Sequence, residues 1–160
     1  MPNTLTKSAS TPRRRHSSLG AQLTVSILRT AAVLERFYNH LVMEHGVTIQ
    51  QYDVLRILRS AGSKGLPTLT IRDRMIHEAP GITRLIDRLE QAGFVRRVRT
   101  SPDRRQVLCQ IAPSGSALLA QLDAAVARAD AEAVSHLSVA QQRQLLRLLQ
   151  DVRSSRPNAG

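Results

Sequence analysis

The chain has 160 residues, and 23 lysines and arginines against 12 acidic residues give it a net charge of +11 at neutral pH. Aliphatic residues supply most of the 42% apolar content and aromatic residues only 2% of the chain, which favours helices over a β-sandwich or barrel. The single cysteine excludes a framework of internal disulfides. No apolar run reaches the ~20 residues that are needed to span a bilayer. The positive charge predicts a polyanionic partner, either nucleic acid or an anionic membrane surface.

The positive charge is concentrated in two segments. Residues 1–18 hold four basic residues and no acid, and residues 63–111 hold ten basic and five acidic residues, whereas the segments between and after them each carry a net charge of +1. Since residues 1–18 are also nearly free of apolar side chains, we expect a disordered basic arm. A solvated tail, an arm that follows phosphates and an organellar transit peptide remain open as its role.

The first half of the chain predicts two helices. Apolar residues recur every three or four positions from residue 19 to about residue 44, which is typical of one stripe along a long helix. A second helix is predicted over residues 48–60. Its beginning, from Thr48 to Gln51, has the sequence of a capping box.

Two short helices joined by a tight turn are predicted next. The first covers residues 67–76, with either Thr68 or Thr70 as its N-cap. The second has Pro80 in its first turn and stops at Gly93, as prolines and glycines do at helix ends. One side of this second helix is apolar: Ile82, Leu85, Ile86 and Leu89. The pair predicts a helix-turn-helix.

A β-hairpin is predicted directly after this pair. Residues 94–100 and 105–111 alternate as strands do, and Ser101-Pro-Asp-Arg104 between them is typical of a turn. The remainder predicts two further helices, the second of which opens with a capping box from Ser138 to Gln141. The predicted fold is mainly α with a small β-hairpin wing.

These pieces, in this order and spacing, resemble the MarR-type winged-helix transcriptional regulators over most of residues 19–153. The matching residues are Gln51-Tyr52 with Val54-Leu55, Thr83-Arg-Leu-Ile-Asp87-Arg-Leu-Glu90, Gly93-Phe-Val and, most specifically, Asp103-Arg104-Arg105 with Val107-Leu108, Ile111 and Pro113-Ser-Gly115.

The sequence departs from the family pattern at three positions. Arg72 stands where the family usually has a small residue, and Thr70 where it often has Glu. Ala112 replaces the threonine that usually precedes the Pro-x-Gly turn, which leaves Ser114 as the candidate substitute for the missing hydroxyl cap.

The resemblance implies a winged helix-turn-helix DNA-binding lobe over residues 48–111. Helical dimerisation segments over residues 19–47 and 112–153 would flank it, with a frayed tail over residues 154–160. A homodimer would hold two recognition helices about one DNA turn apart (~34–36 Å), which predicts a roughly palindromic operator. We therefore expect a sequence-specific regulator, most simply a repressor, in the cytoplasm, with double-stranded DNA and a second copy as partners and no membrane.

Four candidate residues lie on the predicted recognition helix. With the apolar side inward, Arg84, Asp87 and Arg88 face outward and Thr83 lies at the flank. We expect Thr83 and Arg84 to reach base edges or nearby phosphates, and Arg88 to contact phosphate. Because an unpaired Asp87 would repel the DNA backbone, we expect it to orient an arginine. The alternative for the arginines is an ordinary solvated helix face.

Five more candidate residues lie on the wing. Arg97 and Arg99 share one strand face and are expected to position the wing on phosphates. Arg104 and Arg105 lie beside Asp103 at the tip, and the resemblance places the family's wing arginine at Arg105. A thin hairpin tipped with arginine suits the minor groove, whose negative potential attracts guanidinium groups.

The resemblance also implies a small-molecule effector, because family members often bind lipophilic, frequently anionic compounds between the dimer helices and the DNA-binding lobe. Candidate residues near that junction are Arg36, Tyr38, His45 and Tyr52, and a structural role is the alternative for each. Cys109 is predicted to be a small buried apolar residue of the wing, with redox sensing as the alternative.

Nothing in the sequence predicts an enzyme, a cofactor or a metal site. The five histidines show no metal-ligand spacing, and there is neither a phosphate-binding glycine loop nor a nucleophile elbow. The rival to a specific regulator is a winged-helix interaction or scaffold protein that binds nucleic acid non-specifically.

Overall fold

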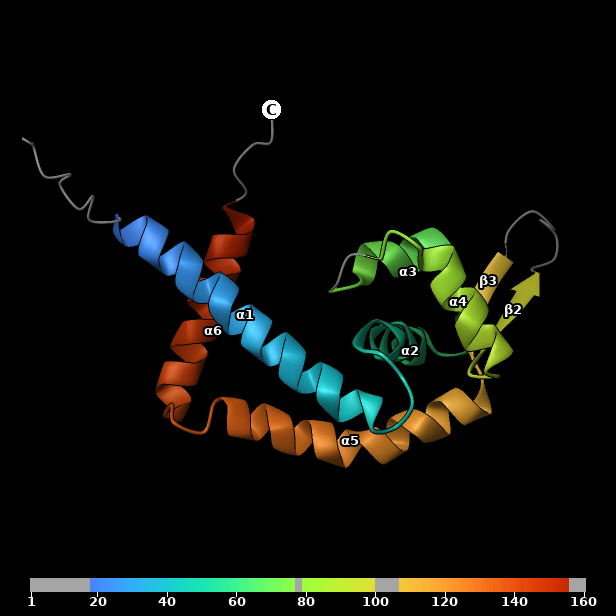
Figure 1. Cartoon of the computed structure of the whole chain (residues 1–160). Coiled ribbons are helices and arrows are strands. Elements are labelled where there is room, and N and C mark those ends of the chain that lie inside the picture. Colours follow the sequence, from blue (N-terminus) through green and yellow to red (C-terminus); the bar gives the residue numbers. More distant parts are fainter. Residues whose placement is uncertain (1–17, 77–78, 100–106, 156–160) are drawn as a thin grey trace, which may run out of the picture. The chain divides into compact units, whose positions relative to one another are not determined.

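The structure, a computed structural model, describes residues 18–76, 79–99 and 107–155 (Figure 1). The elements in chain order are α1 (Leu19–Met43), α2 (Ile49–Ala61), a 3₁₀ turn (Gly62–Lys64), β1 (Leu66–Pro67), α3 (Thr68–Arg74), α4 (Ile82–Gln91), β2 (Val95–Arg99), β3 (Val107–Ile111), α5 (Pro113–Ala133) and α6 (Val139–Ser154). The predicted wing tip and nearly all of the predicted basic arm lie outside the described residues. No helix within the described ranges is long and apolar enough to cross a membrane.

The chain divides into two units, residues 1–33 and residues 34–160, with the boundary inside α1. In the first unit, Ser18 caps the helix, because its hydroxyl oxygen accepts the N–H of Ala21 at 3.2 Å. Large apolar side chains of this part of α1 are exposed: Leu19 and Leu28 are 72% and 64% accessible. An amphipathic helix in this condition needs a further surface to cover its stripe.

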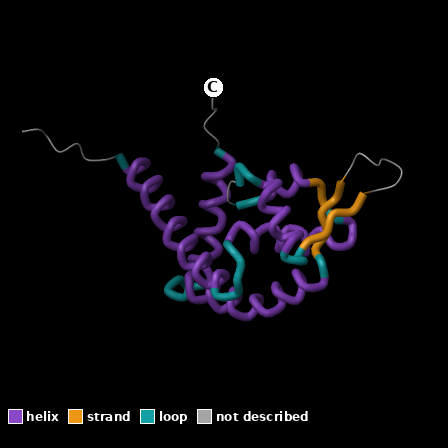
Figure 2. The backbone as a smooth tube through the Cα atoms, turned by 45° about the vertical axis from the view of Figure 1, so that its right-hand side comes forward, coloured by secondary structure: helices purple, strands orange, loops and turns teal. Residues whose placement is uncertain are grey.

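The second unit contains the predicted winged helix. The sheet has the order β1-β3-β2 and is antiparallel throughout, with Arg97 opposite Cys109 and Val95 opposite Ile111 (Figure 2). Its core combines residues of α2, α3, α4 and α5 with the sheet; the largest fully buried side chains include Leu55, Leu58, Ile71, Ile86, Leu89, Leu119 and Leu122. The predicted fold class is confirmed. Cys109 is fully buried, as predicted for an apolar wing residue.

A buried carboxylate holds the segment between α3 and α4. Asp53 of α2 is 3% exposed, and its Oδ2 accepts the N–H of Ile76 at 2.8 Å. Its Oδ1 lies 3.5 Å from the guanidinium of Arg56. Since a buried charge is costly without partners, these contacts are what make Asp53 tolerable in the core.

Both predicted capping boxes are confirmed. In each, the hydroxyl of Thr48 or Ser138 accepts a backbone N–H three residues later, and the glutamine side chain there accepts the N–H of the cap residue.

The predicted helix starts in the helix-turn-helix need correction. Neither Thr68 nor Thr70 caps α3, because the extended Pro67 occupies the N-cap position and both threonines are already helical. The helix α4 begins at Ile82 and not at Pro80, since Gly81 adopts a non-helical conformation (φ −109°, ψ 39°) before the helix.

Two further local predictions are wrong or incomplete. Ser114 does not cap α5: its hydroxyl donates to the carbonyl oxygen of Gly93 at 2.5 Å, and the N-cap residue Ala112 receives no side-chain hydrogen bond. The two-residue strand β1 was not predicted.

Arg72, the departure from the family pattern on α3, points outward and pairs with Asp73 at 3.0 Å, so it causes no packing conflict.

Candidate nucleic-acid interface

The outward face of α4 is the first part of the candidate interface. Ile82, Ile86 and Leu89 are buried, whereas Thr83, Arg84 and Arg88 are exposed, as the apolar pattern predicts. Among the described residues, neither the Arg84 nor the Arg88 guanidinium has an ion pair or hydrogen bond. Both cations are therefore available to an external anion.

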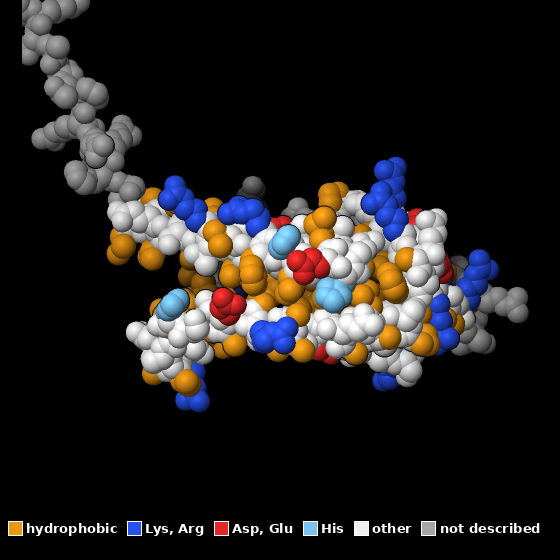
Figure 3. Space-filling model, turned by 60° about the horizontal axis from the view of Figure 1, so that its bottom comes forward, with side chains coloured by type: hydrophobic (Ala, Val, Ile, Leu, Met, Phe, Trp, Pro, Cys, Tyr) orange, Lys and Arg blue, Asp and Glu red, His pale blue; other side chains and the backbone are white. Residues whose placement is uncertain are grey.

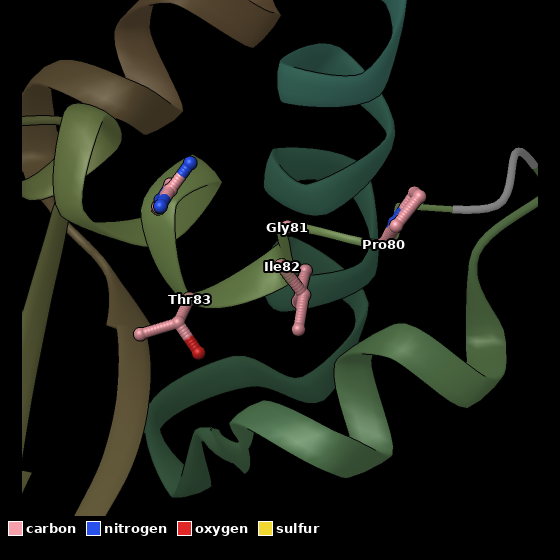
Figure 4. A pocket seen from close by; sticks show the side chains of 5 residues that line it. Pro80, Gly81, Ile82 and Thr83 are labelled. Atoms are coloured by element: carbon pink, nitrogen blue, oxygen red, sulfur yellow. The ribbon is translucent and has the colours of Figure 1, made fainter.

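The N-terminal end of α4 is open. A hollow of about 520 Å³ is lined by Pro80, Gly81, Ile82, Thr83 and Arg84 (Figure 4). Because Gly81 supplies no capping side chain, the backbone N–H groups of Thr83 and Arg84 find no acceptor within the described part of the chain. Free N–H groups and the positive end of the helix dipole both favour an anion at such a place.

Asp87 and Arg97 form the contact that the sequence predicts in general terms, namely an acidic residue of α4 orienting an arginine. Arg97 Nη2 lies 2.6 Å from Asp87 Oδ1, and Arg97 Nη1 lies 2.5 Å from Glu90 Oε2. The backbone N–H of Arg97 also donates to Glu90 Oε1 at 3.1 Å. Partial burial lowers the pKa of Arg97, but the hydrogen bonds to Asp87 and Glu90 outweigh it and raise that pKa.

The other arginines of β2 are arranged differently. Arg96, on the opposite face, donates from Nε to Gln110 Oε1 at 3.1 Å, and Gln110 in turn donates to the Ser63 carbonyl at 2.7 Å. Arg99 is exposed and has no partner among the described residues. The predicted tip residues Asp103, Arg104 and Arg105 lie outside the described part of the chain.

The candidate effector residues separate into two pairs. Arg36 and His45 are exposed. Tyr38 is half-buried and its hydroxyl donates to Asp130 Oδ1 of α5, whereas Tyr52 is 7% exposed and its hydroxyl has no hydrogen-bond partner within the described ranges. Burial is the main cause that raises the pKa of Tyr52.

Two acidic residues of α5 were missed by the sequence reasoning. Asp130 binds Tyr38 of α1, and Asp123 accepts two hydrogen bonds of 2.9 Å from Arg59 of α2. Those bonds lower the pKa of Asp123. The two carboxylates are seven residues apart and so lie on one face of the helix. The spacing of Asp123 and Asp130 was therefore a signal in the sequence that could have identified this face of α5 as a contact face.

Tyr38 predicts an alkaline dependence of stability. Burial and the hydrogen bond to Asp130 raise its pKa from 10.0 to about 12, so folding favours the neutral phenol. This contribution is complete below pH 10.0 and is lost as the pH rises toward 12. We expect wild type to lose more unfolding free energy over this range than Tyr38→Phe, measured by urea denaturation at several pH values. Parallel losses would contradict the assignment.

A winged helix whose exposed helix carries arginines without partners among the described residues is typical of DNA-binding proteins. The MarR family model matches residues 47–107. A MarR transcription factor of Planctomyces limnophilus is 34% identical, with a TM-score of 0.64 over 85% of this chain and 98% of that one. The transcriptional regulator TtmR of Methylorubrum extorquens is 34% identical over 113 residues, 71% of this chain and 57% of TtmR. The chain belongs to the MarR family.

Members of the MarR family are transcription regulators and not enzymes, and this chain is grouped with them. It spans little more than half the length of TtmR. A mutant MarR of E. coli complexed with operator DNA has the same fold, with a TM-score of 0.74, 24% identity and coverage of 85% of this chain and 99% of that one.

Proposed function

We propose that the chain binds a roughly palindromic operator as a homodimer and represses transcription from it. The observation that carries the proposal is the exposed face of α4, where Arg84 and Arg88 are unpaired among the described residues beside the open helix end. Thr83 and Arg84 would reach base edges in the major groove, and Arg88 and Arg99 would contact phosphates. Arg105 would enter the minor groove from the wing tip.

The dimer is supported by apolar surface that the single chain leaves uncovered. Several large apolar side chains of α1 are exposed, and α6 buries none of its residues among those described; apolar side chains at the surface are visible in Figure 3. Those on α6 are Val139, Leu145, Leu146, Leu148 and Val152. Exposed apolar surface rimmed by polar residues is typical of protein–protein contacts.

A small effector is the third part of the proposal. Tyr52 offers a buried hydroxyl without a partner in the described residues, and Tyr38, Arg36 and His45 lie on the neighbouring α1 segment or just after it. A lipophilic anion would satisfy the hydroxyl and bury its apolar part. By linkage, an effector that binds better to the DNA-free state weakens DNA binding by the same factor.

Selection of bound sequences from random double-stranded DNA tests the proposal. We expect a site with two related half-sites about one helical turn apart, a complex whose mass contains two chains, and binding that survives competitor DNA as salt is raised. Binding without sequence preference would support the rival scaffold function instead. Repeating the titration with aromatic carboxylates tests the effector, and expression from a promoter that carries the selected site tests repression.

A further inference from the structure

Arg97 differs from the described candidates Arg84, Arg88 and Arg99 because its guanidinium is already occupied. Asp87 and Glu90 are three residues apart on α4, so both project toward β2 from the same side of the helix. The Arg97 side chain is 26% exposed between them, with one nitrogen on each carboxylate. Charge-assisted hydrogen bonds of this length are among the stronger polar contacts in proteins.

The carboxylates of Asp87 and Glu90 are unfavourable on a DNA-binding helix, because negative charges repel DNA phosphates. Asp87 immediately precedes Arg88, and the exposed side of the same helix carries Arg84. Charges within about 10 Å of one another interact appreciably at 0.1 M salt, so unbalanced carboxylates there would repel the phosphates that the neighbouring arginines attract. Arg97 offsets this repulsion from within the protein.

Arg97 also joins two parts of the interface mechanically. Its backbone N–H and its side chain both contact Glu90, so strand β2 is fixed to α4 by main chain and side chain together. This double contact fixes the direction of β2, the first strand of the predicted wing, relative to the recognition helix.

We propose that Arg97 is a positioning residue whose guanidinium does not contact DNA. It neutralises Asp87 and Glu90 and fixes the base of the wing on α4, so that both DNA-contacting elements approach the duplex as one body. This inference rests on the proposed operator binding and replaces the phosphate contact that the sequence predicts for Arg97.

Three variants and one matched control test the role of Arg97, with operator affinity measured by fluorescence anisotropy across a salt series. Arg97→Gln leaves both carboxylates uncompensated and is expected to weaken binding about tenfold or more. The triple variant Arg97→Gln/Asp87→Asn/Glu90→Gln removes the repulsion and keeps neutral hydrogen-bonding groups, so most of the affinity should return. Arg97→Lys keeps the positive charge but lacks the planar guanidinium that contacts both carboxylates at once. It should give an intermediate loss of operator affinity at an unchanged salt slope.

Arg99→Gln is the control, because Arg99 lies two residues along the same strand and is exposed without a partner among the described residues. It should lower the salt slope by about 0.9 for each subunit of the dimer, as loss of one phosphate contact per subunit does, and removing the carboxylates should not rescue it. The same behaviour from Arg97→Gln, with no rescue in the triple variant, would overturn the positioning role.

Thermal unfolding of each variant separates a folding defect from a binding defect. Restored affinity in the triple variant at any melting temperature above the assay temperature supports the inference, because a merely unfolded protein would not regain binding. Failure of wild type to prefer any DNA sequence would instead overturn the proposed function, and this inference with it.

Discussion

Arg84→Ala is expected to weaken operator binding by roughly 5- to 150-fold for each half-site, which corresponds to the ~1–3 kcal/mol of one bidentate contact to guanine. Arg84 is exposed in the first turn of α4, has no partner among the described residues, and lies beside the open helix end. Residues at this end of a recognition helix meet base edges first. The loss should be concentrated at one base pair of each half-site.

The measurement is a titration of wild type and variant against the selected operator and against operators changed at single positions. Arg128→Ala is the matched control, because it removes the same charge from an exposed position on α5. A uniform loss on every sequence, with a lower salt slope, would show that Arg84 contacts phosphate and reads no base.

Gly115→Ala is expected to destabilise the fold by about 1–3 kcal/mol, the usual cost of overpacking. Gly115 lies in the first turn of α5, where an added Cβ would overlap the carbonyl oxygen of Phe94 and approach Ile111 Cγ1 at 3.1 Å. That carbonyl cannot easily retreat, since it accepts the N–H of Ala112 at 2.9 Å.

Urea denaturation followed by circular dichroism measures this cost. Gly81→Ala is the control, because an added Cβ there meets no atom within 4 Å and the backbone has a negative φ. Its unfolding free energy should stay close to that of wild type. Equal stability of the Gly115 and Gly81 variants would show that the α5 junction tolerates a side chain.

Features encoded by neighbouring residues were predictable from the sequence. The capping boxes at Thr48 and Ser138 involve only residues three apart, and the apolar stripes of the long helices repeat locally. Gly93 ends α4 as predicted: with a φ of 76° it allows its own N–H and that of Phe94 to bond back to Glu90 and Leu89.

Features that depend on distant parts of the chain were not predictable. β1 has two residues and exists only because it pairs with β3, some 40 positions later. The sequence left the hydroxyl of Ser114 as the candidate cap of α5, but in the folded lobe that hydroxyl donates to the Gly93 carbonyl instead.

The candidate site shows the same division. The outward face of α4 follows from the helical period, so Thr83, Arg84 and Arg88 could be identified in advance. The sequence indicated that Asp87 needs an arginine, but many arginines surround it, and only the packing of β2 on α4 selects Arg97. The roles of the wing-tip residues stay predictions.

The contacts along α5 connect the base of the wing to α2 and α1. Its first turn is seated on the Phe94 carbonyl at Gly115, while Asp123 and Asp130 further along hold α2 and α1. Its 21 residues extend for about 32 Å. A tilt of about 5° would therefore displace one end by about 3 Å relative to the other, given the rise of an α-helix. A change of helix direction where Tyr38 meets Asp130 would thus be carried to the first turn of α5, directly after β3.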